Sequence, residues 1–275
     1  LAGERLCANC GQLLGLAVGA PGLADSATGT LLFAPNLKWE NVALRDILRS
    51  AFPNVPIFVE NEANMAALGE YFFGAAKGYK EVLFISAGVG LGGAVILDGA
   101  IFKGTTGYAS EFGHMTMDPH GELCNCGNRG CWETQVSQAA LFRLIRQAIE
   151  RGKPSLLTEI TGGNLNRLTV PLVIDAARKG DRVARAALNR IGRHLGVGVA
   201  SLVNVFNPDL VVFGGIMSLA GEFLLPIIQE ELAARALKWN REATAVILAE
   251  HGFDACVMGG VAMLYQTILS QPGSL

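Results

Sequence analysis

The chain has 275 residues, of which 51% are hydrophobic and 17% charged, so it holds enough apolar material for a large core and is not a disordered chain. Its net charge is -2 and no Lys or Arg run exceeds two residues, which excludes a basic surface that grips nucleic acid backbones. No apolar stretch reaches the roughly 20 residues of a membrane span, and no signal-peptide pattern is present. We therefore expect a cytoplasmic protein with no membrane partner.

Apolar runs bounded by turn residues alternate along the chain with segments of helical periodicity. The runs have the length and composition of buried strands and cover residues 15–22, 55–62, 81–90, 93–99, 208–215 and 244–250. Helical spacing of apolar residues appears over 64–75, 138–152, 170–180, 182–206 and 255–269. This alternation predicts an α/β fold. A change of composition near 74–80 predicts a boundary between two lobes, with the last helix returning to the first lobe.

Three of the predicted strands end in glycine-rich turns, and these would meet at the carboxyl edge of a sheet, where α/β folds bind ligands. The run "SAGVGLGGAV" at 86–95 leads from strand to strand, whereas a dinucleotide fingerprint needs a helix after its glycines, so a Rossmann site is excluded. Phosphate binding through backbone N–H groups and simple close packing both stay open. The glycines concerned are Gly88, Gly90, Gly92, Gly214 and Gly215.

The segment "SEFGHMTMDPHGELCNCGNRGCWET" at 110–134 contains a candidate metal site. His114, Cys124, Cys126 and Cys131 form a Cys3His set, one of the closed combinations of structural zinc, which leaves no open position for catalysis at the metal. A disulfide is disfavoured, because three thiols leave one unpaired and a Cys-x-Cys ring is strained. Three free cysteines are the alternative. The other cysteines, interpreted as inert or as core residues, are Cys7, Cys10 and Cys256.

Polar side chains gather around the same segment. Asn61 and Glu62 stand where a strand gives way to a helix, and would point to the ligand-binding edge of the sheet. Glu111 and His114 are three residues apart, as on one side of a helical turn, and Glu133 follows the last cysteine by two. Such donors and acceptors suit a polyhydroxylated ligand such as a sugar, with one His114 nitrogen on the metal and the other free to donate. The alternative is a dipole-stabilised first-turn carboxylate at Glu62 and a solvated Glu111.

These motifs resemble the ROK family, named for repressors, open reading frames and sugar kinases. The resemblance rests on E-x-G-H followed by C-x-C-G-x-x-G-C-x-E, and extends to "VGAPG", "APNLKW", "ENEANMAALGE", the glycine loop and "NPDLVVFGG". It implies a two-lobed fold of the actin-like, ribonuclease-H-like kind with a structural zinc loop and a sugar bound between the lobes. The lobes would be residues 1–76 plus 258–275, and residues 77–257 with the zinc motif at 111–133.

The resemblance also assigns roles to residues. The family's sugar-contacting positions match Asn36, Asn61, Glu62, Glu111, His114 and Glu133. Its zinc ligands match His114, Cys124, Cys126 and Cys131.

Departures from the family's kinases favour a regulator over an enzyme. The kinases carry Asp at the position of Glu62 as general base on the sugar hydroxyl. An extra methylene moves that base by about an ångström, a misplacement that can cost about 10²-fold in rate. They also tend to have Gly-Thr-Gly where this chain has Gly88-Val89-Gly90, so no hydroxyl is offered to a phosphate. The family's first phosphate motif, Asp-x-Gly-x-Thr, is absent before the strand at 15–22.

We therefore predict the sugar-sensing, oligomerising domain of a ROK-type transcriptional repressor, a homodimer or homotetramer that binds a monosaccharide or sugar phosphate. The chain begins at Leu1 and not at Met, so we interpret it as a fragment, and the resemblance to the family's repressors implies an upstream winged helix-turn-helix through which operator DNA is bound. The alternative is an ATP-dependent hexose kinase, such as a glucokinase or aminosugar kinase, which would use ATP and magnesium. A structural zinc protein without a ligand is a third possibility, but it leaves the carboxylates unexplained.

Overall fold

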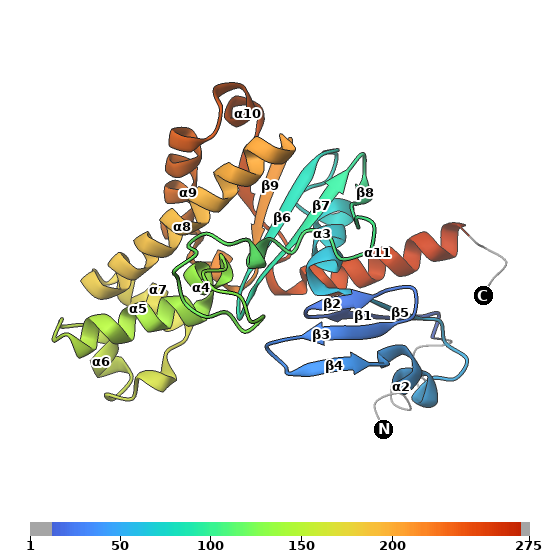
Figure 1. The fold of residues 1–275 in the computed structure, drawn as a ribbon, viewed down its shortest axis with the longest axis horizontal. Helices are drawn as coiled ribbons and strands as arrows, with labels where there is room; N and C mark the ends of the chain where they lie inside the picture. The colour runs from blue at the N-terminus through green and yellow to red at the C-terminus, as the bar shows by residue number, and fades with distance from the viewer. Residues whose placement is uncertain (1–12, 271–275) are drawn as a thin grey trace.

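Residues 13–270 are described by the computed structural model, in which three β-sheets meet around two helices, α3 and α11 (Figure 1). Strands and helices alternate through most of the chain, so the predicted α/β class is confirmed. The interpretation of Cys7 and Cys10 as inert falls outside the described residues.

The largest sheet has five strands in the order β10-β9-β6-β7-β8. Strands β6, β9 and β10 are parallel, whereas β7 and β8 run antiparallel to their neighbours. Ser86 lies opposite Gly214 in the β6–β9 pair, so the glycine turns after these two strands share one edge, as predicted. The strands are β6 (Val82–Ala87), β7 (Leu91–Leu97), β8 (Ala100–Ile101), β9 (Leu210–Gly214) and β10 (Ala245–Leu248).

Both faces of this sheet are buried, because successive side chains of a strand point to opposite sides. On β6, Leu83 and Ile85 join a large helical core on one face, while Val82 and Phe84 pack toward α3 on the other. The helices of the first face are α4 (Glu133–Val136), α5 (Gln138–Glu150), α6 (Leu156–Ile160), α7 (Val170–Arg178), α8 (Arg182–Phe206) and α9 (Gly221–Arg235). The remaining short helical segments are α10 (Lys238–Ala243), η1 (Phe112–His114), η2 (Leu165–Arg167), η3 (Ile216–Ala220) and η4 (Gly252–Asp254).

Helix α8 is the longest helix among the described residues and matches its predicted bounds of 182–206. The Asp181 side chain caps its first turn by accepting a hydrogen bond from the Ala184 N–H at 2.7 Å. It ends at Asn207, which takes the left-handed conformation with φ 47° that Asn tolerates better than most residues.

Two small sheets precede this unit. Strands β1 (Leu16–Ala20) and β5 (Ile57–Asn61) are parallel, and both were predicted. The second sheet is an antiparallel meander that the sequence analysis did not identify, followed by helix α2 (Leu44–Ala51). Its strands are β2 (Leu23–Asp25), β3 (Thr30–Ala34) and β4 (Trp39–Val42). A small apolar core formed by Ala20, Ala24, Leu31, Ala34 and Val59 joins the two sheets.

Helix α3 (Glu62–Phe73) lies between the sheets and packs along helix α11 (Ala255–Ser270). The two backbones touch at glycines. A Cβ on Gly69 would overlap the carbonyl oxygen of Ala255, and a Cβ on Gly259 would overlap that of Met65. Any side chain at either glycine would therefore push the helices apart.

The carboxylate of Glu70 fixes the end of α3. It is fully buried and accepts backbone hydrogen bonds from Ala75, Glu250 and His251 at 2.8–3.0 Å. The last two donors lie between β10 and α11, so one side chain ties α3 to the segment that leads into its partner helix.

The predicted lobe boundary at 74–80 falls in turns between α3 and β6. The division into residues 1–76 plus 258–275 and 77–257 stays a prediction. Within residues 13–270, no helix combines the length and apolarity needed to cross a membrane.

Replacing Gly259 with Ala tests the contact between α3 and α11. In an ordinary helix this change is stabilising by about 1 kcal/mol, but here the overlap with Met65 reverses the sign, and we expect a loss of about 2 kcal/mol or more. Chemical unfolding of the full-length protein measures it. Val261→Ala, on the exposed side of α11, is the control and should change stability by less than about 0.5 kcal/mol. A stabilised Gly259→Ala variant would show that the helices do not touch.

Candidate functional site

The metal-binding segment folds into two short bridged turns. Isolated bridges pair Thr116 with Cys131 and Leu123 with Arg129, which brings the cysteines back to the turn that carries His114. At Gly130 the chain has φ 65°, and a Cβ there would overlap the carbonyl oxygen of Asp118, so only glycine fits.

The four predicted metal ligands converge. Their ligand atoms all lie within 4.8 Å of one another. Cys124 Sγ is 3.8 Å from His114 Nδ1, and Cys126 Sγ is 3.7 Å from Cys131 Sγ. Bonds of about 2.3 Å from a tetrahedral ion to sulfur would separate the sulfurs by about 3.8 Å, so the set fits a four-coordinate metal.

Burial disfavours the charged form of two of these thiols. Burial raises the pKa of Cys124 to about 12, with the neighbouring thiols adding to the effect, and burial also raises the pKa of Cys131. A cation at the centre would offset the cost of removing these protons, because metal binding and thiol deprotonation are linked. The structure thus contains a possible Cys3His metal site, as predicted.

Trp132 anchors this segment to the helical core. Its side chain is fully buried, and its Nε1 donates to the carbonyl oxygen of His194 in α8 at 2.9 Å. Gly198, one turn further along α8, has no side chain where the indole ring lies. Trp132 stands between Cys131 and Glu133, so the anchor holds a metal ligand and a candidate sugar ligand together.

Glu111, His114 and Glu133 form one polar group beside the metal site. His114 Nε2 lies 4.0 Å from Glu111 Oε2, so its two ring nitrogens face the metal site and the carboxylate respectively. Burial raises the pKa of Glu111, the neighbouring His114 lowers it, and the neighbouring Glu133 raises it. The predicted placement of Glu111 and His114 on one side of a turn is confirmed.

Asn36 joins this group from the meander sheet. Its Oδ1 accepts a hydrogen bond from Asn125, between two metal ligands, at 2.8 Å. A Cβ on Gly90 would lie 3.2 Å from Asn36 Nδ2 and would overlap Glu133 Oε2. Glu133 Oε2 also accepts from the Leu91 N–H at 2.9 Å. The glycine loop after β6 therefore contacts two of the residues predicted to bind the sugar.

Asn61 and Glu62 lie at the start of α3. Asn61 caps the helix by accepting from the N–H groups of Ala63 and Asn64, and its Nδ2 donates to the Gly22 carbonyl at 2.8 Å. Glu62 is open to solvent, but the surrounding protein desolvates its carboxyl group enough to raise the pKa.

Glu62 lies near Cys256 of helix α11. Burial, and then the nearby charge of Glu62, raise the pKa of the half-buried Cys256 to about 11. Within residues 13–270, no hydrogen bond or ion pair connects Glu62 to Glu111, His114 or Glu133. The two groups of predicted ligands are linked through packing, since a Cβ on Gly92 would lie 3.0 Å from the Cβ of Ala63.

The five predicted loop glycines have different surroundings. Gly92 and Gly214 are limited by packing, the first against Ala63 and the second against the Phe84 ring. Gly215 has φ 76° and approaches the backbone of Ala87. A Cβ on Gly88 would make only an ordinary contact with Ile216, and the Gly88 N–H donates to the Gly90 carbonyl at 2.8 Å. Whether any of them contacts a phosphate stays a prediction.

Several residues next to the site have no clear signal in the sequence. Ser110, directly before Glu111, has φ 73°, rare for a residue with a side chain, and its buried hydroxyl has no hydrogen-bond partner among the described residues. Asn125 was visible only as a polar residue between two cysteines. Glu60 and Lys103, which form an ion pair beside Asn61, carry no local signal because they lie far apart in the sequence.

The family model "ROK family" matches residues 4–267. The chain belongs to the ROK family. Its fold is the actin-like α/β fold of the family's sugar kinases, as predicted. The family assignment made from the cysteine and carboxylate motifs is confirmed.

Both branches of the family resemble this chain. It is 37% identical to a xylose repressor of Caldicellulosiruptor bescii over 260 residues, which are 94% of this chain and 64% of the repressor. A ROK transcriptional regulator, described as a homologue of the E. coli MLC protein, superposes with a TM-score of 0.85 at 29% identity. The match covers 96% of this chain and 65% of the regulator. A ROK glucokinase from Streptomyces griseus, in complex with glucose and AMPPNP, superposes with a TM-score of 0.87 at 34% identity. The match covers 96% of this chain and 87% of the glucokinase. The chain thus spans less than two thirds of the regulators.

The metal site predicts one bound ion per chain, for which the sequence indicates zinc. Elemental analysis of chelator-washed full-length protein should find about one equivalent. Cys126→Ser should lower the metal content severalfold and loosen the segment 110–134, because ligand binding contributes to folding free energy. Cys256→Ser, outside the cluster, is the control and should keep the metal. A folded protein with well under one ion per chain would refute the site.

Proposed function

We propose that this chain is the sugar-sensing, oligomerising module of a ROK-type transcriptional repressor. The observation that carries the proposal is the pair Glu62 and Val89, which replace the groups that a sugar kinase of this family uses for proton abstraction and phosphate contact. Within the whole protein, a homodimer or homotetramer, operator DNA would be bound by a domain outside this chain.

The Glu62 side chain is better suited to binding a sugar hydroxyl than to removing its proton. It is the first residue of α3, and the family's kinases carry the shorter Asp there. General-base catalysis needs the carboxylate within hydrogen-bond reach of the sugar hydroxyl, and the additional methylene shifts it from the position that Asp would take. A carboxylate with a raised pKa can still accept a hydrogen bond from a hydroxyl, which is all that sensing requires.

The loop after β6 offers few groups to a phosphate. Val89 is 64% exposed at its tip and has no hydroxyl. The Gly88 N–H is bonded to Gly90, and the Leu91 N–H to Glu133. Phosphoryl transfer depends on positioning and charge stabilisation, so a loop that has lost a hydroxyl and has two of its backbone donors already engaged is poorly suited to it.

The groups beside the metal site suit a polyhydroxylated ligand. Glu111 and Glu133 supply acceptors, while His114 Nε2 and the second N–H of Asn61 supply donors. A bound metal would hold the other nitrogen of His114, so the ion would set the orientation of a sugar contact without touching the sugar. We propose a monosaccharide or its phosphate as the ligand and zinc as the ion.

Sugar binding would act on DNA by changing the relative placement of the lobes. A ligand shifts a conformational equilibrium only through different affinities for the two states, and contacts from both sides of the site provide that difference. In a dimer, the shift would alter the spacing of the two DNA-reading heads.

A kinase is the second candidate. This chain spans 87% of the glucokinase from Streptomyces griseus, a larger share than it spans of either regulator. The structure of that glucokinase contains a nucleotide analogue. Under this alternative, ATP and magnesium would lie at the shared edge of β6 and β9, and Glu62 would act as the base.

Sugar binding should raise thermal stability. A ligand that binds only the folded state adds about 2.7 kcal/mol at a hundredfold excess over its Kd. Screening pentoses, hexoses and N-acetyl aminosugars against the full-length protein should give at least one positive shift, lost in Glu111→Ala while the metal content stays unchanged. Glu40→Ala, on the exposed strand β4, is the control and should keep the shift. The absence of a thermal shift with every sugar would contradict the proposed site.

The full-length protein should not phosphorylate the sugar that it binds. Coupled ADP release with magnesium-ATP should stay near background in the unmodified protein and in Glu62→Asp. The double variant Glu62→Asp/Val89→Thr has the better chance of turnover, because it restores both the base and a phosphate contact. Turnover above about 1 s⁻¹ in the unmodified protein, within the usual range of enzymes, would favour the kinase instead.

A further inference from the structure

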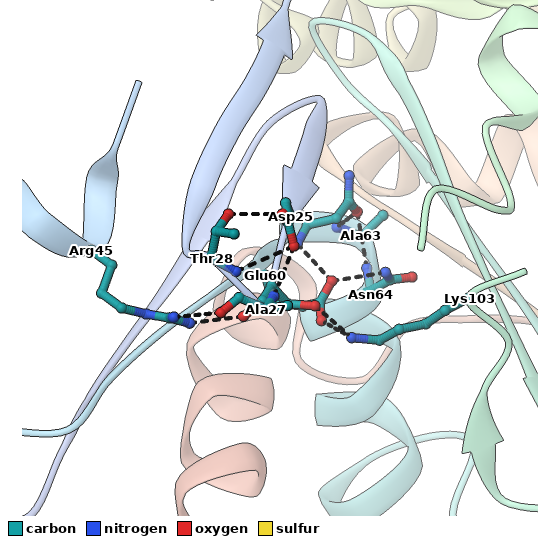
Figure 2. A network of polar contacts seen from close by, with 10 residues as sticks. Asp25, Ala27, Thr28, Arg45, Glu60, Ala63, Asn64 and Lys103 are labelled. Carbon is teal, nitrogen blue, oxygen red and sulfur yellow. Dashed lines mark hydrogen bonds and ion pairs between the residues drawn. The ribbon is translucent and has the colours of Figure 1, made fainter. Parts of the chain in front are cut away.

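Glu60 is a buried carboxylate directly before the candidate ligands Asn61 and Glu62. It lies in β5 and is only 3% exposed. Its Oε1 accepts hydrogen bonds from the Asn61 N–H at 2.9 Å and from Asn64 Nδ2 at 3.1 Å. Its Oε2 lies 2.5 Å from Lys103 Nζ. Figure 2 shows Lys103 pointing toward this carboxylate. A carboxylate buried this deeply needs a counterion, and Lys103 supplies it.

Lys103 reaches Glu60 from a different part of the fold. It follows β8, the edge strand of the five-stranded sheet, whereas Glu60 belongs to the two-stranded sheet. The same ammonium donates to Ser26 Oγ at 2.9 Å, and Ser26 follows β2 of the meander. One positive charge therefore connects all three sheets.

The turn that holds Ser26 is itself fixed. Arg45 donates to the carbonyl oxygens of Ser26 and Ala27, each at 2.7 Å. The Asp25 carboxylate accepts from the Ala27 N–H at 2.9 Å and from the Thr28 hydroxyl at 2.8 Å (Figure 2). Lys103 thus binds to a preformed pair of acceptors, and movement of its own loop is the simplest way to break the contact.

Both ends of this bridge continue into the candidate sugar site. On one side, Glu60 is followed by Asn61 and Glu62 at the start of α3. On the other, the segment from Lys103 leads to Glu111 and His114, and the Ala109 N–H closes it by donating to the Lys103 carbonyl at 3.1 Å. The bridge therefore limits how far the two groups of ligands can separate.

We propose that the Glu60–Lys103 ion pair holds the two halves of the sugar site at binding distance, with Lys103 as a positioning residue that does not touch the sugar. This inference rests on the proposed sugar-binding function. Separation of the halves would leave Glu60 buried without a counterion, so the paired state is favoured before the sugar arrives. Part of the cost of assembling the site is thereby met in the free protein, which raises sugar affinity.

Removing the charge of Lys103 tests the bridge in two independent ways. In Lys103→Met, hydrogen exchange of the segment 102–113 without sugar should speed up severalfold, because its anchor is lost. The Kd for D-xylose or D-glucose, whichever gives the larger thermal shift, should rise tenfold or more. Lys103→Arg should restore most of the affinity. Lys77→Met, the same change at an exposed lysine, is the control and should alter neither quantity.

A double-mutant cycle separates the ion pair from general damage. Glu60→Gln keeps an acceptor for Asn61 but removes the charge that Lys103 neutralises. The variant Lys103→Met/Glu60→Gln contains no buried unpaired charge, so it should fold even if Lys103→Met does not. Its Kd should be higher than that of the unmodified protein by about the same factor as the Kd of either single variant, since each variant removes the same interaction.

The outcomes distinguish this inference from the function on which it rests. Faster exchange together with weaker sugar binding supports the bridge. Unchanged exchange and unchanged affinity in Lys103→Met overturn it. Faster exchange with unchanged affinity overturns the link to the sugar site. If neither sugar binds the unmodified protein and the wider sugar screen is also silent, the proposed function fails, and the inference about affinity fails with it.

Discussion

Helices α3 and α11 touch backbone to backbone, and this contact fixes the position of Asn61 and Glu62, one half of the candidate site. Glycines at 69 and 259 remove the side chains that would hold the helices apart, and the Glu70 carboxylate fixes the end of α3 through three backbone donors. With its axis fixed, α3 presents Asn61 and Glu62 at its first turn. The helix thus acts as a rigid support that sets where one half of the site lies.

The other half is held by a different kind of force. The segment 110–134 has little regular structure, and it is held by two isolated β-bridges, by four candidate ligand atoms around one point and by the indole ring of Trp132 in the core. A metal concentrates the stabilisation of such a segment at one ion, where a helix spreads it along its length. Loss of the ion would therefore disturb His114, Glu111 and Glu133 together, while α3 would keep its place.

Most of the fold could be predicted where the sequence pattern is long and periodic. The helix at 182–206 was correct to the residue because its apolar spacing, Asp181 cap and Asn207 terminus agree. The meander was missed, because β2 has three residues and β4 is largely exposed, so neither shows a buried alternation. Helix α9 was also not predicted; it contains Pro226, a residue that usually marks a helix end.

The metal ligands were predictable because their chemistry lies within 18 residues of sequence and thiols with an imidazole have few other uses together. The Glu60–Lys103 pair was not, since 43 residues separate its members and charged residues are common on any surface. Only the fold reveals that this glutamate is buried and that this lysine is the cation beside it.

The crowding at Gly90 limits which substitutions a protein of this kind can accept when its function changes during evolution. Glu62 and Val89 both face solvent, so their side chains can be exchanged without disturbing the packing. Position 90 has no such freedom, because any side chain would collide with Glu133 and crowd Asn36. Substitutions at positions 62 and 89 are therefore structurally tolerated, whereas any side chain at position 90 would displace Glu133 and Asn36.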